Sequence, residues 1–199
     1  MEKRPNVIFI LADDLGWGDV GFHDSPIRTP NLDRLARRGV ELDRHYVCPV
    51  CTPTRVSLMT GRHPSRFGAH ATVPSNDPVL ADNYFTLANL FRNAGYATGL
   101  FGKWHLGSDP KFGPWNYGFD TAYGSFAGGV DSYSHLYKPG PYIRTWHRDG
   151  VLCDEPGHVT DLITDEAINW IESTRRPFFC YLPYTAVHTP ILPPERDPE

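Results

Sequence analysis

The chain has 199 residues, a formal net charge of −4 and a hydrophobic content of 40%. This length suffices for one sizeable domain with a hydrophobic core. The weak negative charge excludes a broad attraction to nucleic acid or to an anionic membrane surface. No apolar run is long enough to span a bilayer, so we expect no membrane span. Four cysteines in a chain of this length do not make a disulfide scaffold.

The N-terminal part of the chain predicts alternating strands and helices. Residues 6–12, NVIFILA, form a continuous apolar run, which is typical of a strand buried on both faces of a parallel sheet. A helix is predicted from the cap at Thr29 to Gly39, with proline in its first turn. Residues 40–46 form a plausible second strand. A short helix follows from Cys51 and ends before a glycine.

The rest of the chain continues this alternation between long irregular segments. The predicted order is a surface loop at 62–84, a helix opened by Thr86 and ended near Gly95, a strand at 96–101, an irregular segment at 107–157, a helix at 158–174 and a strand at 178–184. Alternating strands and helices predict an α/β fold with a mostly parallel sheet and helices on both faces. Nothing marks an internal domain boundary, so we expect residues 1–199 to form one unit.

Polar side chains directly follow three of the predicted strands. Asp13 and Asp14 follow the first strand, Lys103 and His105 follow the strand at 96–101, and His188 follows the last. In open α/β sheets, ligands bind beyond the carboxyl ends of the strands. These five residues are therefore predicted to meet at one edge of the sheet.

The pentapeptide Cys51-Thr52-Pro53-Thr54-Arg55 places a sulfur nucleophile at the start of a helix. Thr52 can cap this helix, and Pro53 suits its first turn. Free backbone N–H groups, the positive end of the helix dipole and the guanidinium of Arg55 would all favour an anion there. This pattern predicts a reactive cysteine beside an anion site.

Two further patterns leave alternatives open. Asp13 and Asp14 are hard oxygen donors that suit Ca²⁺ or Mg²⁺ if the chain turns after them, whereas a lone pair of aspartates can also be a cap or a solvated turn. Cys48 and Cys51 form a C-x-x-C, which is compatible with a redox site, although that reading gives Arg55 no role. Lys103 and the histidine two residues later would share one face of an extended segment.

The pentapeptide fits Cys-x-Pro-x-Arg and resembles the nucleophile motif of the sulfatase family. Four other segments match family motifs in family order and span almost the whole chain: residues 11–19 (LADDLGWGD), 60–62 (TGR), 102–107 (GKWHLG) and 187–190 (VHTP). The residues of these motifs are most similar to those of arylsulfatases of the B type. The resemblance implies an alkaline-phosphatase-like α/β fold and the hydrolysis of sulfuric esters.

The resemblance also implies a cofactor built from the chain. A maturation enzyme would oxidise Cys51 to formylglycine, and a divalent cation, Ca²⁺ or Mg²⁺, would be held by Asp13, Asp14 and the oxygen of residue 51. One hydroxyl of the hydrated aldehyde would attack the sulfate sulfur, and the second would later expel sulfate. Arg55 would orient the hydrate.

The remaining roles concern the sulfate group. The resemblance implies that Lys103 and His188 bind sulfate, that His105 handles the proton of the second hydroxyl, and that Ser134 is a further substrate-binding residue. The substrate would be a sulfated small molecule or saccharide. A phosphate- or phosphonate-ester hydrolase of the same superfamily is the alternative enzyme.

Family members are longer, and two of their later motifs have no match here. The Asp-Asn pair that completes the metal site and a second sulfate-binding lysine are not found before Glu199. We therefore expect the N-terminal portion of a sulfatase catalytic domain, with a sheet incomplete towards the C-terminus. A catalytically incompetent anion-binding fragment is the non-enzymatic alternative. No secretory signal is visible, whereas family members are commonly exported, so the compartment stays open.

Overall fold

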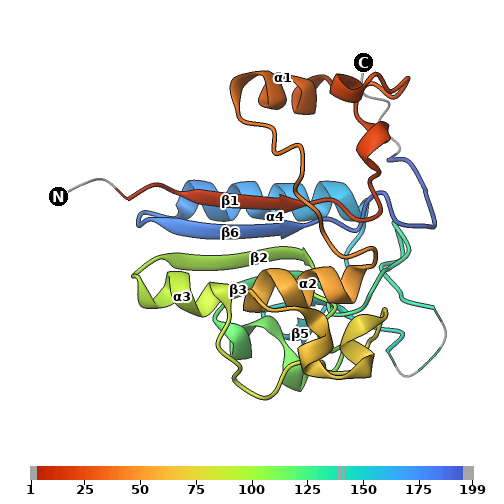
Figure 1. Cartoon of the computed structure of the whole chain (residues 1–199). Coiled ribbons are helices and arrows are strands. Elements are labelled where there is room, and N and C mark those ends of the chain that lie inside the picture. The colour runs from red at the N-terminus through yellow and green to blue at the C-terminus, as the bar shows by residue number, and fades with distance from the viewer. Residues whose placement is uncertain (1–3, 139, 141, 195–199) are drawn as a thin grey trace.

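A computed structural model describes residues 4–138, 140 and 142–194. In these residues, a six-stranded sheet forms the centre of the fold (Figure 1). Its strands lie in the order β1 (Val7–Leu11), β6 (Phe178–Pro183), β2 (Ala97–Lys103), β3 (Thr121–Ser125), β4 (Trp146–Arg148) and β5 (Val151–Leu152). The first four strands pair in parallel, and β4 and β5 join antiparallel. The predicted α/β class is confirmed, with a mixed sheet.

Helices cover both faces of the sheet, as predicted. The helices are α1 (Pro30–Arg38), α2 (Cys51–Thr60), α3 (Leu87–Asn93) and α4 (Val159–Ser173). Figure 1 shows α2 and α3 on one side of the sheet and α4 on the other. The side chains of β6 alternate accordingly: Phe179 and Tyr181 pack in the cluster that contains α2 and α3, whereas Cys180 and Leu182 pack in the cluster that contains α4. Burial on both faces explains the continuous apolar run of this strand.

Two sequence-based predictions of secondary structure are wrong. Residues 40–46 are not a strand; Val40 is 87% exposed and Tyr46 is 85% exposed. A strand needs a neighbour for its backbone groups, and no described segment pairs with this one. The segment at 107–157 contains β3, β4 and β5; β3 and β4 contain glycine or polar residues, and β5 has only two residues. Sheet pairing, not local propensity, determines these three strands.

The predicted helices are confirmed, but the predicted cap by Thr29 is wrong, because its Oγ1 donates to Oδ1 of Asp33 (2.7 Å) and accepts from no backbone N–H of α1. Thr86 caps α3 by accepting hydrogen bonds from the backbone N–H groups of Ala88 and Asn89. Gly61 ends α2 with a left-handed φ of 64°. The loop predicted at 62–84 contains two short 3-10 turns, Pro64–Phe67 and Ala69–Thr72. Among the described residues, no helix has the length and apolar character needed to cross a membrane.

The carboxyl ends of β1, β6 and β2 lie side by side. Beyond these strands, the N–H of Asp13 donates to the carbonyl of Ala186 (2.9 Å), and the N–H of Val187 donates to the carbonyl of Asp13 (2.7 Å). Gly102 has a φ of 133°, and a Cβ there would lie 2.0 Å from the carbonyl oxygen of Pro183. Only glycine therefore lets the end of β2 approach β6 this closely. This approach places Lys103 next to the end of β1.

His147 gives the fold an expected sensitivity to acid. Its imidazole is fully buried and stacked on Phe126 with 3.8 Å between ring centroids, and its Nε2 has no hydrogen-bond partner among the described residues. Burial lowers the pKa of His147 from 6.5 to about 3. Below pH 6.5 the unfolded chain therefore binds a proton that the folded chain excludes, so stability falls by up to about 1.4 kcal/mol per pH unit towards pH 3.

We expect His147→Phe to reduce this acid sensitivity. Urea unfolding measured between pH 7.5 and pH 4 should show a smaller loss of stability in His147→Phe than in the wild type. His45→Gln is the control, because His45 is exposed and should leave the pH slope unchanged. Equal slopes in all three proteins would contradict the assignment of this sensitivity to His147.

Candidate active site

A cavity of about 800 Å³ opens at the carboxyl edge of the sheet. Five of the predicted site residues line it: Asp14, Cys51, His105, Ser134 and His188. They come from the ends of β1, β2 and β6, from the start of α2 and from the loop that follows β3. The prediction that polar residues after the strands gather at one edge is therefore confirmed by the structure.

Cys51 is the first residue of α2 and is partly exposed to the cavity. The N-cap is Val50, whose side chain offers no acceptor, so the predicted cap by Thr52 is wrong. Thr52 is instead buried, and its Oγ1 accepts a hydrogen bond from the N–H of Ser75 (3.0 Å). Because no side chain caps the helix, its first N–H groups remain suited to an anion. Cys51 and Cys48 are both free thiols.

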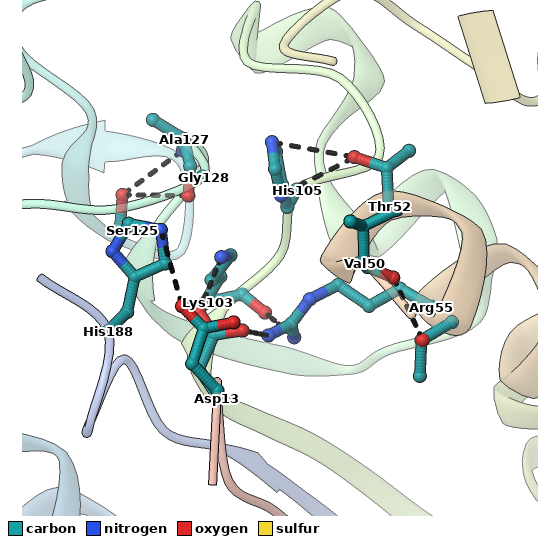
Figure 2. Close-up of polar contacts among 12 residues, drawn as sticks. Asp13, Val50, Thr52, Arg55, Lys103, His105, Ser125, Ala127, Gly128 and His188 are labelled. Carbon is teal, nitrogen blue, oxygen red and sulfur yellow. Dashed lines mark hydrogen bonds and ion pairs between the residues drawn. The ribbon is translucent and has the colours of Figure 1, made fainter. Parts of the chain in front are cut away.

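One carboxylate and two cations are buried together beside Cys51. Asp13, Arg55 and Lys103 are 4%, 1% and 0% exposed. Nζ of Lys103 donates to Oδ2 of Asp13 (2.5 Å), and Nη2 of Arg55 lies 3.7 Å from Oδ1 of the same carboxylate (Figure 2). Nη1 of Arg55 donates to the carbonyl of Lys103 (2.8 Å). The three groups carry a net positive charge, which favours an anion nearby.

Burial is the main influence on the charge of Lys103. It lowers the pKa of the ammonium below 10.5, the positive charge of Arg55 adds to that effect, and Asp13 opposes it. Lys103 is not among the described residues that line the cavity, because its side chain is turned towards Asp13. The expectation that Lys103 and His105 share one face is wrong: the backbone turns to a φ of 56° at His105.

The imidazole of His105 is buried at the wall of the cavity. Burial holds its pKa well below 6.5, and the charges of Lys103, Arg55 and His188 lower it further. His105 is therefore neutral near pH 7 and is able to accept a proton.

Asp14 and His188 both line the cavity and lie next to each other. Asp14 has a left-handed φ of 59° and an exposed carboxylate, unlike the buried Asp13. Nε2 of His188 lies 3.9 Å from Oδ2 of Asp14, and its Nδ1 is 2.6 Å from the carbonyl oxygen of Thr189. A proton on Nδ1 satisfies that carbonyl and leaves Nε2 facing the cavity.

Ser134 lines the cavity, but its hydroxyl is already engaged. Its Oγ donates to Oδ1 of Asp131 (3.0 Å), which also accepts from the N–H of Ser134 (2.8 Å). The neighbouring His135 points away from the cavity, since its ring stacks on Trp146 and its Nε2 lies 3.0 Å from the carbonyl oxygen of Gly157.

A cation would have to bind in a second, smaller cavity of about 260 Å³. Asp13, Asp14, Cys51 and Arg55 are among the residues that line it. The two carboxylates offer the hard oxygen donors that Ca²⁺ and Mg²⁺ prefer. No group of three or more histidine, cysteine or acidic side chains is close enough to hold a metal among the described residues. These residues therefore fit part of a cation shell, since Ca²⁺ takes six to eight oxygen ligands.

The parallel strand order and the helices on both faces define an α/β fold of the alkaline-phosphatase-like class. A solved protein of the alkaline phosphatase superfamily from Vibrio parahaemolyticus shares this fold, with a TM-score of 0.62 and 22% identity over 100% of this chain and 44% of that one. The chain belongs to the sulfatase family, because the family model for sulfatases matches residues 5–199.

Two curated relatives also support membership of the sulfatase family. Arylsulfatase J of Mus musculus is 37% identical over 98% of this chain and 34% of that protein. N-acetylgalactosamine-6-sulfatase of Homo sapiens is 36% identical over 95% of this chain and 40% of that protein. The chain thus spans well under half the length of these relatives. Both names are those of sulfatases.

Solved structures support the family at the level of the fold. The crystal structure of Ps i-CgsB has a TM-score of 0.85 and 37% identity over 94% of this chain and 46% of that one. The structure of BT4656 in complex with its substrate, D-glucosamine-2-N,6-O-disulfate, has a TM-score of 0.79 and 31% identity over 96% and 36% of the two chains. The predicted family and the predicted fold class are confirmed.

Proposed function

We propose that the protein is a sulfuric-ester hydrolase of the arylsulfatase type. The observation that carries this proposal is the position of Cys51 in a Cys-x-Pro-x-Arg sequence, at an uncapped helix N-terminus that opens into the cavity. Membership of the sulfatase family supports it. In the reaction, water is consumed, the bond from sulfur to the alcohol oxygen breaks, and that oxygen takes a proton.

The proposed cofactor is a formylglycine made from Cys51 by a maturation enzyme, together with Ca²⁺ or Mg²⁺. Sulfatases are generally formylglycine- and metal-dependent, which supports this choice. Asp13, Asp14 and the oxygen of residue 51 would hold the cation, with the remaining ligands supplied from elsewhere. Aldehyde hydrate and cation would together supply a nucleophilic oxygen that a thiol lacks.

The other residues neutralise charge, transfer protons or bind the sulfate group. Arg55 neutralises the oxygens at residue 51, from which it is one helical turn away. His105 accepts a proton, which its neutral state at pH 7 allows. As an imidazolium, His188 would donate the proton on Nε2 to the leaving oxygen while its Nδ1–H stays on the carbonyl of Thr189. Lys103 would bind sulfate once its ammonium turns from Asp13 towards the cavity, and Ser134 would contribute a further contact at the cavity wall.

The proposed substrate is a sulfated saccharide. A cavity of about 800 Å³ is large enough for far more than a sulfate group. The solved relative BT4656 has the sulfated sugar D-glucosamine-2-N,6-O-disulfate as its substrate, and Ps i-CgsB has been solved with k-i-k-neocarrahexaose.

Matched aryl sulfate and aryl phosphate substrates test the proposal. We expect turnover of the sulfate to exceed that of the phosphate, to be lost in a chelator and to return with added Ca²⁺. A preference for the phosphate would favour the superfamily alternative. Sulfate binding without turnover, measured with the chain after maturation, would favour the anion-binding fragment.

A further inference from the structure

Asn76 joins two of the loops that carry the candidate active site. Its Oδ1 accepts hydrogen bonds from Oγ of Ser108 (3.0 Å) and from the N–H of Gly128 (3.0 Å). Its backbone carbonyl accepts a third hydrogen bond from the N–H of Ser108 (2.8 Å). Ser108 lies in the loop after β2, and Gly128 lies in the loop after β3. Asn76 lies in the segment predicted only as a surface loop at 62–84, so this role was not predictable from the sequence.

Gly128 forms one side of the slot that holds His105. A Cβ at Gly128 would lie 2.4 Å from Nε2 of His105, so the glycine backbone lies directly against the imidazole. Figure 2 shows the imidazole between Gly128 and Thr52. Oγ1 of Thr52 lies 3.4 Å from Nδ1 and 3.5 Å from Nε2 of the ring. Thr52 is itself held by the N–H of Ser75, the residue next to Asn76.

The contacts of the imidazole with Thr52 are long for hydrogen bonds. The backbone of His105 also has a left-handed φ of 56°, which is uncommon for a residue other than glycine. The orientation of the ring therefore depends on the two walls of the slot rather than on one short hydrogen bond. The wall at Gly128 is held by Asn76.

We propose that Asn76 is a positioning residue that fixes the imidazole of His105 by holding Gly128 against it. This inference rests on the proposed function for the role of His105 in proton transfer. Loosening this wall admits water and lets the ring turn away from the reacting atoms. A small displacement of a catalytic group is enough to cost about 100-fold in rate.

Three charged or titratable groups face His105: Lys103, Arg55 and His188. The first two are positive and buried, so they disfavour protonation of the imidazole, and desolvation acts in the same direction. Water that enters beside Gly128 screens these charges and hydrates the imidazolium. The pKa of His105 then rises towards 6.5.

The test compares Asn76→Ala with Asn89→Ala. Asn89 is a matched control, since its Oδ1 also accepts two hydrogen bonds, from the N–H and Oγ1 of Thr86, but in the cap of α3 rather than at the cavity. The pKa of His105 is measured by NMR with labelled histidine, and kcat and KM are measured with an aryl sulfate. We expect Asn76→Ala to raise the pKa of His105 and to lower kcat by about 10- to 100-fold, with a much smaller change in KM.

Asn89→Ala should lower stability but leave the pKa of His105 unchanged. Asn76→Asp keeps an oxygen acceptor, so it should preserve slow hydrogen exchange at the amide of Gly128, which Asn76→Ala should lose. If Asn76→Ala does not fold, Asn76→Ser gives the same comparison with a shorter polar side chain. An unchanged pKa and kcat in Asn76→Ala (or in Asn76→Ser, if Asn76→Ala does not fold), or an equal change in Asn89→Ala, would overturn the inference. The NMR measurement needs no turnover, so an inactive wild type would refute the proposed function without deciding this one.

Discussion

Replacing Cys51 by alanine is expected to abolish sulfate-ester hydrolysis. The Cys51 side chain lines the cavity at the start of α2, one helical turn from the buried guanidinium of Arg55. Alanine cannot be converted to an aldehyde and offers no oxygen for attack on sulfur. Loss of the nucleophile should reduce kcat by at least about a thousandfold. The assay is hydrolysis of an aryl sulfate in the presence of Ca²⁺.

Cys48→Ala is the matched control for this experiment. Cys48 is three residues away and lies 3.7 Å from Oγ of Ser57, outside the proposed chemistry. It should retain nearly full activity. Equal loss of activity in both variants would instead support a redox pair formed by Cys48 and Cys51. Mass spectrometry of the peptide that contains Cys51 adds an independent result, because an unmodified thiol in an active protein would contradict the formylglycine proposal.

Strand-end position was the strongest structural signal in the sequence. The run at 178–184 is apolar without alternation because helices cover both faces of the sheet at β6. The prediction that the run at 6–12 is buried on both faces is wrong, because β1 is an edge strand whose Ile8 and Ile10 are 50% and 54% exposed. Since β1, β6 and β2 are parallel, the polar residues after them meet at one edge. That geometry brought Asp14, His105 and His188 into one cavity. Their chemical roles stay predictions until they are measured.

Features that depend on distant contacts could not be predicted from local sequence. Asp13 and Asp14 are adjacent, yet one is buried between two cations and the other is exposed, because the fold brings Lys103 and Arg55 to the first only. The hydroxyl of Thr52 was expected at the helix cap but is taken by Ser75. The local sequence around Thr52 is compatible with a hydroxyl that caps the helix and with one that binds a distant backbone group, so only the tertiary contact decides between these two roles.

The pair of adjacent aspartates gives the largest expected effect on stability. Asp13→Ala leaves the ammonium of Lys103 and the guanidinium of Arg55 buried without their carboxylate. Breaking a buried ion pair from one side costs about 3–5 kcal/mol, because the remaining charges stay desolvated. Asp14→Asn removes an exposed negative charge, and asparagine tolerates the left-handed φ of 59° there, so it should change stability by no more than about 0.5 kcal/mol. Urea unfolding at pH 7 without added metal measures both.

The pH dependence of the Asp13→Ala variant distinguishes an electrostatic cause from a simple packing defect. In the wild type, Asp13 raises the pKa of Lys103 against the lowering effects of burial and Arg55. Without Asp13 the folded-state pKa falls further below 10.5, so the unfolded variant binds a proton that the folded variant releases. Stability of the variant then rises with pH, and its deficit relative to the wild type should shrink from pH 7 to pH 9. If the stability deficit of the Asp13→Ala variant is constant over this range, the loss is due to packing. Equal stability of the Asp13 and Asp14 variants would contradict the buried charge cluster of Asp13, Arg55 and Lys103 itself.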